Sequence, residues 1–321
     1  MADLLAALRR RRLSIASTVA LALAVRCLRD AYVRLSRGIQ LSEGGVCLVT
    51  GASSGVGAAV AEELARRGAA KVILVARGAR RLTLVSERVS AAGAEPIIVA
   101  ADCSDCEAVR RMANMVMAVH GCPSILVLAA GAGRWRRLTE MSTEQALGCS
   151  DAPYHSSLLV SRAFLVDMLT LPRAHICLPQ SPASYCAVAG ATAYVASRWA
   201  LRGLYEALWS DCLGSSVTIS QVVMNEVADS AYFDGDDGES HRRMPRISGL
   251  LGAPVSSAVC AEAVVNTIER GASSGSSNPM LALNIELQSL VPNIYAWLTA
   301  LTSSGRYISQ ANPDRLHDHL T

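Results

Sequence analysis

Lysine is almost absent from this chain of 321 residues. Lys71 is the only lysine among 30 lysines and arginines, so every other basic side chain is an arginine, whose guanidinium keeps its proton. Aromatic residues make up only 4% of the chain, which leaves few rings on which nucleic-acid bases could stack. The formal net charge is only +3, which excludes the strongly basic class of nucleic-acid-binding proteins. We therefore expect no nucleic-acid partner.

Charged residues are also scarce, at 18%, whereas hydrophobic residues make up 51% of the chain. This balance excludes an intrinsically disordered chain and predicts a well-buried core. Ten cysteines are scattered along the sequence, and the one close pair, Cys103 and Cys106, lacks the second pair that a zinc site needs. We therefore expect no metal site, and free thiols in a reducing compartment.

The N-terminal segment has no uncharged run long enough to span a bilayer. Arg9–Arg12 precede an uncharged run of 13 residues, Leu13–Val25, whereas a spanning helix needs about 20 residues. Such a run fits a signal-peptide core, an interfacial anchor or an arginine-rich transit peptide. Leu21–Leu35 alternates apolar and basic residues at helical spacing, which favours a helix on an anionic membrane surface. The alternative is an ordinary solvated helix packed on the domain.

These patterns predict that residues 1–42 form a basic and apolar anchor or targeting segment. We expect the protein to associate with a membrane surface, on the cytosolic face or at the endoplasmic reticulum. Targeting to an organelle by the arginine-rich segment is the alternative. Four arginines beside an apolar run are typical of a membrane-flanking cluster rather than of a nucleic-acid contact.

From Gly45 onward, strand-like apolar runs alternate with helical patterns. We expect strands at Val46–Val49, Lys71–Ala76, Glu95–Ala101, Ser124–Ala130, Ala174–Pro179 and Val217–Met224. Helices are expected at Ala58–Leu64, Arg77–Ala92, Val109–Val119, Tyr154–Leu171, Tyr194–Leu213 and Ser256–Arg270. This alternation predicts the α/β class: a doubly wound parallel sheet (Rossmann fold) in three αβα layers and a single domain.

We place this domain at residues 43–278, and two segments near its C-terminal part have patterns of their own. The polar, irregular loop Asp234–Ser248 is typical of a substrate lid. Residues 279–321 are expected to form a C-terminal apolar extension. Within it, Met280–Leu301 approaches the length of a membrane span but is interrupted by polar residues and a proline, so interfacial packing or closure of a substrate pocket is expected.

A glycine-rich turn connects the first expected strand to the first helix. It reads Thr50-Gly51-Ala52-Ser53-Ser54-Gly55-Val56-Gly57. In an open parallel sheet such a turn presents backbone N–H groups to a phosphate, and its glycines leave room for the ligand. We expect this turn to bind a nucleotide cofactor through Gly51, Ser53, Ser54, Gly55, Val56 and Gly57.

Arg77 ends the second strand, with Arg80 and Arg81 close behind it. NAD-specific sites have an acidic residue here for the ribose hydroxyls, whereas an arginine accommodates the 2′-phosphate of NADP. The alternative is that these are solvated charges at a helix start, although positive charge is unfavourable there. We therefore expect NADP(H) as the cofactor.

Residues at the ends of the next two strands also face the expected cofactor. Asp102 is positioned either to accept a hydrogen bond from the adenine amino group or to cap the helix that follows. The small residues Ala130 and Gly131, at the end of the fourth strand, let the backbone approach the cofactor closely.

Tyr194 and Arg198 lie on one helix face because they are four residues apart, and Ser181 precedes them by thirteen residues. A tyrosine, whose hydroxyl has a pKa near 10, needs a nearby positive charge to act as an acid or base at neutral pH. A serine hydroxyl at the sheet edge can hold a substrate carbonyl as a hydrogen-bond donor. The alternative is that Tyr194 only anchors the core.

The glycine turn, Asp102, Ser181 and Tyr194 with its base at i+4 resemble the classical short-chain dehydrogenase/reductase family. The resemblance covers about Val46–Met224 and implies that Tyr194 is the general acid/base and that Ser181 positions the carbonyl. It also implies that Arg198 holds the nicotinamide ribose, and that the backbone of Val227 meets the carboxamide. Asn225–Val227 and Pro279–Gly305 look like a membrane-associated subgroup that acts on lipophilic substrates.

Several residues depart from the family pattern, among them Leu128-Ala129-Ala130-Gly131 in place of Asn-Asn-Ala-Gly and Met224-Asn225 in place of Pro-Gly. The family's lysine is Arg198 here, and its asparagine in a water-mediated proton relay falls at about Pro153. We expect an NADP(H)-dependent oxidoreductase that interconverts an alcohol and a ketone or aldehyde on a small lipophilic substrate. The alternative is a non-catalytic NADP-binding protein that acts as a sensor or scaffold. We also expect self-association as a homodimer or homotetramer.

Overall fold

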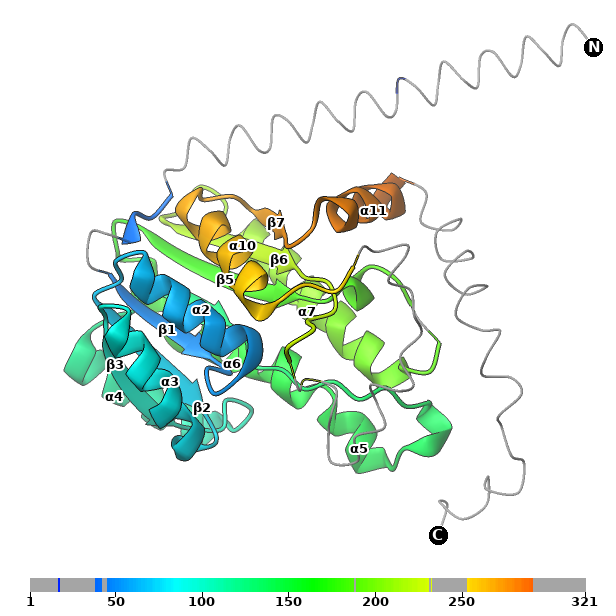
Figure 1. The fold of residues 1–321 in the computed structure, drawn as a ribbon, viewed down its shortest axis with the longest axis horizontal. Helices are drawn as coiled ribbons and strands as arrows, with labels where there is room; N and C mark the ends of the chain where they lie inside the picture. Colours follow the sequence, from blue (N-terminus) through cyan, green and yellow to red (C-terminus); the bar gives the residue numbers. More distant parts are fainter. Residues whose placement is uncertain are drawn as a thin grey trace, which may run out of the picture.

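A seven-stranded parallel sheet forms the centre of the structure, a computed structural model that describes residues 17, 38–41, 45–187, 189–230, 232 and 253–290 (Figure 1). The strand order is β3-β2-β1-β4-β5-β6-β7, so the direction of winding reverses between β1 and β4. The strands are β1 (Val46–Thr50), β2 (Lys71–Ala76), β3 (Glu95–Ala100), β4 (Ile125–Leu128), β5 (Ala174–Gln180), β6 (Val217–Val223) and β7 (Ser274–Ser276). Ligands bind at such a reversal in open α/β sheets, beyond the carboxyl ends of the strands.

Helices cover both faces of this sheet, which confirms the predicted single-domain, three-layer Rossmann fold. One face carries α2 (Gly55–Arg66), α3 (Ala79–Ala91) and α10 (Ser257–Glu269). The other carries α4 (Cys106–His120), α6 (Ser156–Met168) and α7 (Thr192–Asp211). Shorter elements are η2 (Leu138–Glu140), α5 (Thr143–Gly148), η3 (Asp151–His155), η4 (Pro182–Ser184) and α11 (Pro279–Leu290).

The central strands are apolar on both faces because helices cover both. In β4, Ile125 and Val127 pack toward α2 and α10, whereas Leu126 and Leu128 pack toward α4 and α6. All four residues are buried. A continuous apolar run of this kind is the pattern expected for a parallel strand covered on both sides.

The structure differs from the sequence prediction in two elements. The run Gly271–Ser277, which carries no strand signal, contains the edge strand β7, paired with β6 from Gln221 to Val223. Glycine and serine have low strand propensity, so only the tertiary pairing identifies this strand. The helix expected at Tyr154–Leu171 is instead the π-helical η3 followed by α6, because π-helical hydrogen bonds interrupt the regular pattern at Asp151–His155.

Several predictions concern residues that the structure does not describe. The expected substrate lid at Asp234–Ser248 and nearly all of the N-terminal segment 1–42 lie outside the described residues. Of the apolar segment Met280–Leu301, only the part within α11 is described. Among the described residues, no helix combines the length and apolar character that crossing a bilayer requires.

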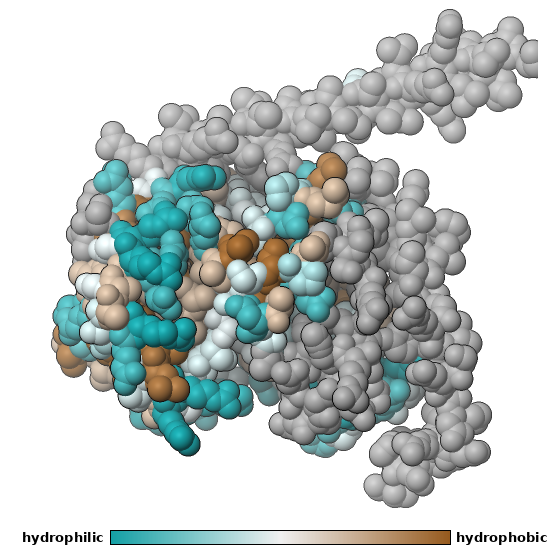
Figure 2. Space-filling view, viewed as in Figure 1, coloured by the Kyte–Doolittle hydropathy of each residue, from teal (hydrophilic) through white to brown (hydrophobic). Residues whose placement is uncertain are grey.

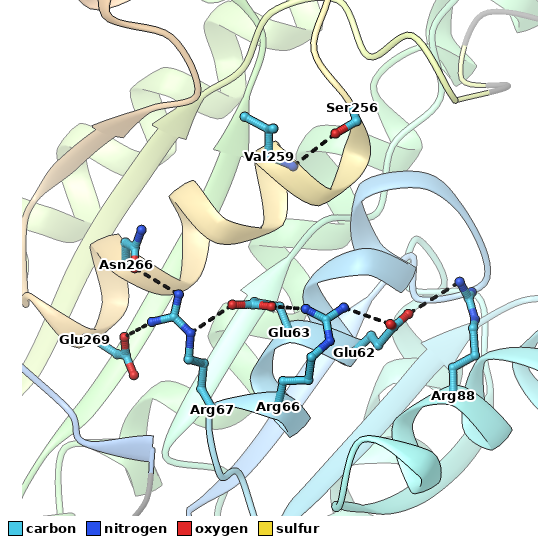
Figure 3. A network of polar contacts seen from close by, with 9 residues as sticks. All are labelled: Glu62, Glu63, Arg66, Arg67, Arg88, Ser256, Val259, Asn266 and Glu269. Atoms are coloured by element: carbon cyan, nitrogen blue, oxygen red, sulfur yellow. Dashed lines mark hydrogen bonds and ion pairs between the residues drawn. The ribbon is translucent and has the colours of Figure 1, made fainter.

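Charged side chains join α2 to both of its neighbouring helices (Figure 3). Arg67 donates to Glu63 on its own helix at 2.8 Å and reaches α10, where it pairs with Glu269 at 2.7 Å and with Asn266 at 3.2 Å. Arg66 pairs with Glu62 and Glu63, and the second oxygen of Glu62 lies 3.5 Å from Arg88 on α3. The surface over α2 and α3 is mostly hydrophilic, with apolar residues visible over α10 and at one place over α3 (Figure 2).

We expect Arg67→Ala to lower the free energy of unfolding by about 1 kcal/mol. The Arg67 side chain is 31% exposed and bridges two helices, so its ion pairs are partly screened by solvent but better held than a surface pair. Urea denaturation of both proteins measures the difference. Arg110→Ala is the matched control, since the Arg110–Glu107 pair is exposed and lies within one helix; an equal loss in both variants would contradict the bridging role.

Candidate active site

The turn after β1 is held against the loop after β4. Gly51 has a φ of 67°, and a Cβ at this residue would lie 2.7 Å from the carbonyl oxygen of Ala129. A Cβ on Gly57 would overlap the carbonyl oxygen of Gly51. The Thr50 hydroxyl accepts a hydrogen bond of 3.1 Å from the N–H of Ala130. Glycine is therefore required at both positions, and the backbone beyond β1 and β4 forms one cradle.

The N-terminus of α2 lies in this turn and has no side-chain cap. Ser54 is the N-cap residue, but its side chain makes no capping hydrogen bond, and the first turn contains no acidic residue. Uncapped N–H groups at a helix N-terminus, reinforced by the helix dipole, favour a bound anion such as a pyrophosphate. The structure thus brings the predicted phosphate-binding residues together in one turn: Gly51, Ser53, Ser54, Gly55, Val56 and Gly57.

Arg77 and Asp102 follow the ends of neighbouring strands, β2 and β3. Arg77 is exposed and Asp102 is half-buried. Burial tends to raise the Asp102 pKa, but two hydrogen bonds from Ser104 and the charge of Arg77 outweigh it, so the pKa is lowered. Asp102 Oδ1 accepts these bonds from the N–H and the hydroxyl of Ser104, at 2.9 and 2.7 Å. The carboxylate is therefore ionised and lies close to the Arg77 cation.

The prediction that Asp102 caps the next helix is wrong. Asp105 is the N-cap residue of α4, and its carboxylate accepts a hydrogen bond of 2.7 Å from the N–H of Ala108. Asp102 instead forms a local turn with Ser104, which leaves the contact with adenine as the remaining hypothesis for this residue.

Two more arginines flank Arg77 at the start of α3. Arg80 and Arg81 lie in its first turn and are exposed, the N-cap residue is Gly78, and this turn also lacks an acidic residue. Positive side chains at a helix N-terminus are unfavourable in isolation, and a bound phosphate would offset that cost.

Ser181 follows β5 and begins the short helix η4. Its hydroxyl oxygen accepts a hydrogen bond of 3.2 Å from the N–H of Ala183, so the hydroxyl hydrogen is left to donate to another group. Because η4 packs against α7, Ser181 is brought to the start of the helix that carries Tyr194.

Tyr194 lies in the first turn of α7 and is only 2% exposed. Its ring packs against Trp135, with 6.1 Å between ring centres, and meets the ring of Tyr232 edge-on at 6.5 Å. Cys186 and Ala183 belong to the same apolar cluster. Tyr194 is therefore held in one orientation by packing, which a general acid requires.

Arg198 lies one helical turn after Tyr194 and on the same face, as the spacing predicts. Its Cζ is 5.3 Å from the centre of the Tyr194 ring, and its Nη2 donates a hydrogen bond to the Tyr232 hydroxyl. Burial alone would lower the Arg198 pKa, but the neighbouring phenols of Tyr232 and Tyr194 raise it overall. Nε of Arg198 is buried and has no hydrogen-bond partner among the described residues. This donor is therefore left for a ligand.

Tyr232 is a site residue that the sequence analysis did not identify. Its hydroxyl contacts Arg198, and the Arg198 Cζ lies 5.5 Å from its ring centre. Burial raises the Tyr232 pKa. The residue belongs to no helix or strand and to no motif, so only the folded chain places it beside Tyr194.

Pro153, at the position of the expected relay asparagine, is buried in the π-helical segment η3. Its carbonyl oxygen accepts a hydrogen bond of 2.7 Å from the Ser157 hydroxyl. A proline lacks an N–H, and a π-helical segment accommodates this gap before α6 begins. Because η3 packs against α7, the altered residue is a neighbour of the helix that carries Tyr194 and Arg198.

Arg202 fixes the loop of Ser181 to α7. Its guanidinium stacks on the ring of Tyr185 at 4.1 Å and donates to the carbonyl of Ser184 at 3.3 Å. The Tyr185 hydroxyl accepts a hydrogen bond of 2.6 Å from Gln221 on β6. These contacts hold η4, α7 and the sheet together around the two predicted catalytic hydroxyls.

The remaining predicted residues lie beyond β4 and β6. Ala130 and Gly131 are half-buried directly after β4, where a Cβ on Gly131 would lie 3.2 Å from Arg198 Nη2. Val227 pairs with Val255 in an isolated bridge whose hydrogen bonds are made by the N–H of Ala228 and the carbonyl of Glu226. The Val227 N–H is thus not used in that bridge.

The glycine turn, Arg77, Asp102, Ala130, Gly131, Ser181 and Val227 follow the carboxyl ends of parallel strands, and Arg198 on α7 lies beside Gly131 at the same end of the sheet. The residues fit a nicotinamide dinucleotide for three reasons. The cradle at Gly51 has no room for a Cβ, the N-terminus of α2 is uncapped, and Nε of Arg198 is a buried donor without a partner among the described residues. The turn after β1 would hold the pyrophosphate, Arg77 the adenosine ribose, and Arg198 the nicotinamide ribose.

Comparison with known proteins agrees with this geometry. Residues 45–232 match the family described as short chain dehydrogenase. D-threitol dehydrogenase of Mycolicibacterium smegmatis is 31% identical over 210 residues, which cover 63% of this chain and 78% of that protein. The 3-ketodihydrosphingosine reductase TSC10 of Cryptococcus neoformans is 27% identical over 234 residues, covering 70% of this chain and 68% of that protein.

A solved structure of a short-chain oxidoreductase is also similar to this chain. A metagenomic short-chain oxidoreductase in complex with NADP superimposes with a TM-score of 0.61 at 28% identity, covering 74% of this chain and 96% of that one. The chain spans less than two thirds of the length of three other curated relatives, between 16% and 65%.

Proposed function

Because this chain belongs to the short chain dehydrogenase family, we propose that it is an NADP(H)-dependent oxidoreductase that interconverts an alcohol and a ketone or aldehyde. The observation that carries this proposal is the buried Tyr194 phenol beside the Arg198 guanidinium, which itself lies next to Gly131 in the loop that is held against the glycine turn. The Arg198 Cζ lies 5.3 Å from the centre of the Tyr194 ring, so its charge is near the hydroxyl that would give up a proton.

Each residue of the site has a distinct task in carbonyl reduction. The hydride for the carbonyl carbon would come from NADPH when it is bound. The Tyr194 hydroxyl donates its proton to the carbonyl oxygen, so that the neutral alcohol is formed. Ser181 donates a hydrogen bond to the same oxygen and holds the carbonyl in place. Arg198 stabilises the Tyr194 phenolate by its charge and cannot replace the proton, which must return from water.

Arg77 and its two neighbours on α3 support NADP over NAD. The 2′-phosphate carries the charge that distinguishes the two cofactors, and three exposed arginines surround the turn where the adenosine ribose would lie. The carboxylate of Asp102 opposes this preference only weakly, since Arg77 already lies near it.

We expect NADPH to raise the thermal midpoint of the protein by about 5 °C at a hundredfold excess over its dissociation constant, and NADH to raise it much less. Arg77→Asp should remove most of the NADPH shift, because it removes a cation and adds a negative charge beside the phosphate. Arg111→Asp, on the exposed side of α4, is the control and should keep the shift. Equal shifts with both cofactors would show that NADP is not preferred.

A second function, non-catalytic binding of NADP(H), is favoured by two observations. Arg198, the replacement for the family's lysine, is already bonded to the Tyr232 hydroxyl, and Pro153 replaces the relay asparagine. In this reading the protein senses the cofactor or holds a partner. NADPH consumption over a broad panel of carbonyl compounds separates the two functions. Wild type and Arg198→Lys should both consume NADPH if the protein is an enzyme, and neither if it is not.

The substrate is proposed to be small and lipophilic. Trp135, Ala191 and Val195 give the surroundings of Tyr194 an apolar lining, and TSC10, named for the reduction of a sphingoid ketone, is a relative.

Association with a membrane surface through residues 1–42, and assembly as a homodimer or homotetramer, are further proposals. The first rests on the arginine-rich apolar sequence alone.

A further inference from the structure

Side chains of this chain itself lie against the turn that follows β1 and the loop that follows β4, where the crevice of such a sheet opens. A Cβ at Gly55, in the turn after β1, would lie 3.0 Å from the Ser230 hydroxyl. A Cβ at Gly131, in the loop after β4, would lie 2.9 Å from both Cε2 and the hydroxyl of Tyr232. The two strands are those between which the sheet reverses its winding. Ser230 and Tyr232 therefore occupy the part of the crevice where a ligand of such a sheet binds.

Tyr232 satisfies the groups that a ligand would otherwise meet at this end. Its hydroxyl accepts a hydrogen bond from Arg198, its ring lies under the Arg198 cation at 5.5 Å, and it meets the Tyr194 ring edge-on. The phenol hydroxyl thus stands where a ribose hydroxyl would meet the guanidinium. A charge-assisted hydrogen bond and a buried cation–π contact are both lost when Tyr232 leaves.

The end of the crevice at which the adenosine would bind is lined by charged side chains. Arg77, Arg80 and Arg81 are exposed, and Asp102 is half-buried. A ligand that carries only the adenosine and phosphate groups would meet these residues and the uncapped N-terminus of α2, without reaching Tyr232.

We infer that Tyr232 is a built-in competitor for one half of the dinucleotide site. This inference rests on the proposed NADP(H) site and deepens it. The adenosine end of the crevice is lined by exposed arginines that follow β2, whereas the nicotinamide-riboside end is available only when the Tyr232 side chain leaves Arg198 and Tyr194. The apparent association constant for NADP(H) is then the intrinsic constant multiplied by the fraction of molecules in which Tyr232 has moved away. The association constant for an adenosine phosphate does not depend on this fraction.

The test compares two probes by calorimetric titration of the full chain: NADPH, and adenosine 2′,5′-bisphosphate, which lacks the nicotinamide half. We expect Tyr232→Ala to bind NADPH at least tenfold more tightly than wild type, and to bind the bisphosphate within twofold of wild type. Tyr232→Phe keeps the ring but loses the hydroxyl, so its affinity for NADPH should lie between those of wild type and Tyr232→Ala. Trp199→Ala, an exposed aromatic residue on α7, is the control and should change neither affinity.

Two results would overturn the inference alone: unchanged or weaker NADPH binding by Tyr232→Ala, or an equal gain for both probes. Absence of binding of either probe to every variant would overturn the proposed cofactor site as well. Wild type provides a second measurement that does not depend on the alanine variant folding. Trp135 packs on Tyr194, so its fluorescence should change with NADP⁺, which does not absorb where tryptophan emits, and not with the bisphosphate; identical responses to both probes would contradict displacement of Tyr232.

Discussion

Tyr194→Phe should lower kcat/KM for carbonyl reduction by about a thousandfold while leaving the dissociation constant of NADPH within about threefold of wild type. The phenylalanine ring keeps the packing against Trp135 and the contact with the Arg198 cation, so only the proton donor is lost. Steady-state kinetics measures the first quantity and calorimetry the second. A fall in kcat without a change in cofactor binding is the signature of a group used in the transition state.

Tyr205→Phe is the matched control for this variant. Tyr205 is also a buried tyrosine, on α7 itself, but its hydroxyl donates a hydrogen bond of 2.8 Å to the carbonyl of Ser273 and has no task in the proposed chemistry. We expect it to lose stability by about 1 kcal/mol and to keep its activity. Turnover that survives Tyr194→Phe would show that another group gives the proton. A wild type without turnover would favour the non-catalytic function.

His175 should make the protein lose stability in mild acid. This side chain on β5 is fully buried, its Nε2 lies 2.7 Å from the Ser220 hydroxyl on β6, and burial lowers its pKa to about 3. The unfolded chain binds this proton at a pKa near 6.5, so between about pH 3 and 6.5 the unfolded state holds more protons than the native state. Stability from this residue is complete above about pH 6.5 and falls as the pH decreases, by about 3 kcal/mol at pH 4.

Urea denaturation of wild type and His175→Gln between pH 7 and pH 4 measures this effect. Glutamine keeps polar groups near Ser220 but does not titrate, so the variant should lose about 3 kcal/mol less than wild type over this range. His155→Gln is the control, because His155 lies exposed beside Asp151 at the surface. Parallel pH profiles for wild type and His175→Gln would mean that the buried imidazole does not govern acid stability.

The elements that the sequence predicts well are those with local physical signals. The apolar run of β4 and the glycine turn at Gly51 both depend on neighbouring residues, since a strand covered on both faces must be apolar and a cradle must lack Cβ atoms. The spacing of Tyr194 and Arg198 places them together because both lie on one helix.

The elements that the sequence does not predict depend on contacts between distant residues. The strand β7 has no apolar residue and exists because β6 offers it hydrogen-bond partners. Tyr232 lies in the site because it packs against α7 and Gly131, and no spacing or periodicity marks it. Asp102 and Asp105 are both able to cap a helix from sequence alone, and only the position at which α4 begins selects Asp105.

The two edges of the sheet have consequences for how the protein behaves at high concentration. An open edge strand is a template on which another chain can add a strand and begin aggregation. At one edge, β7 is only three residues long, Ser274–Ser276, and α11 packs beside it. At the other, β3 contains Pro96, which has no N–H to donate, next to the charged Glu95. Both edges are therefore poor templates, and a native sheet of otherwise apolar strands is protected against growth into fibrils.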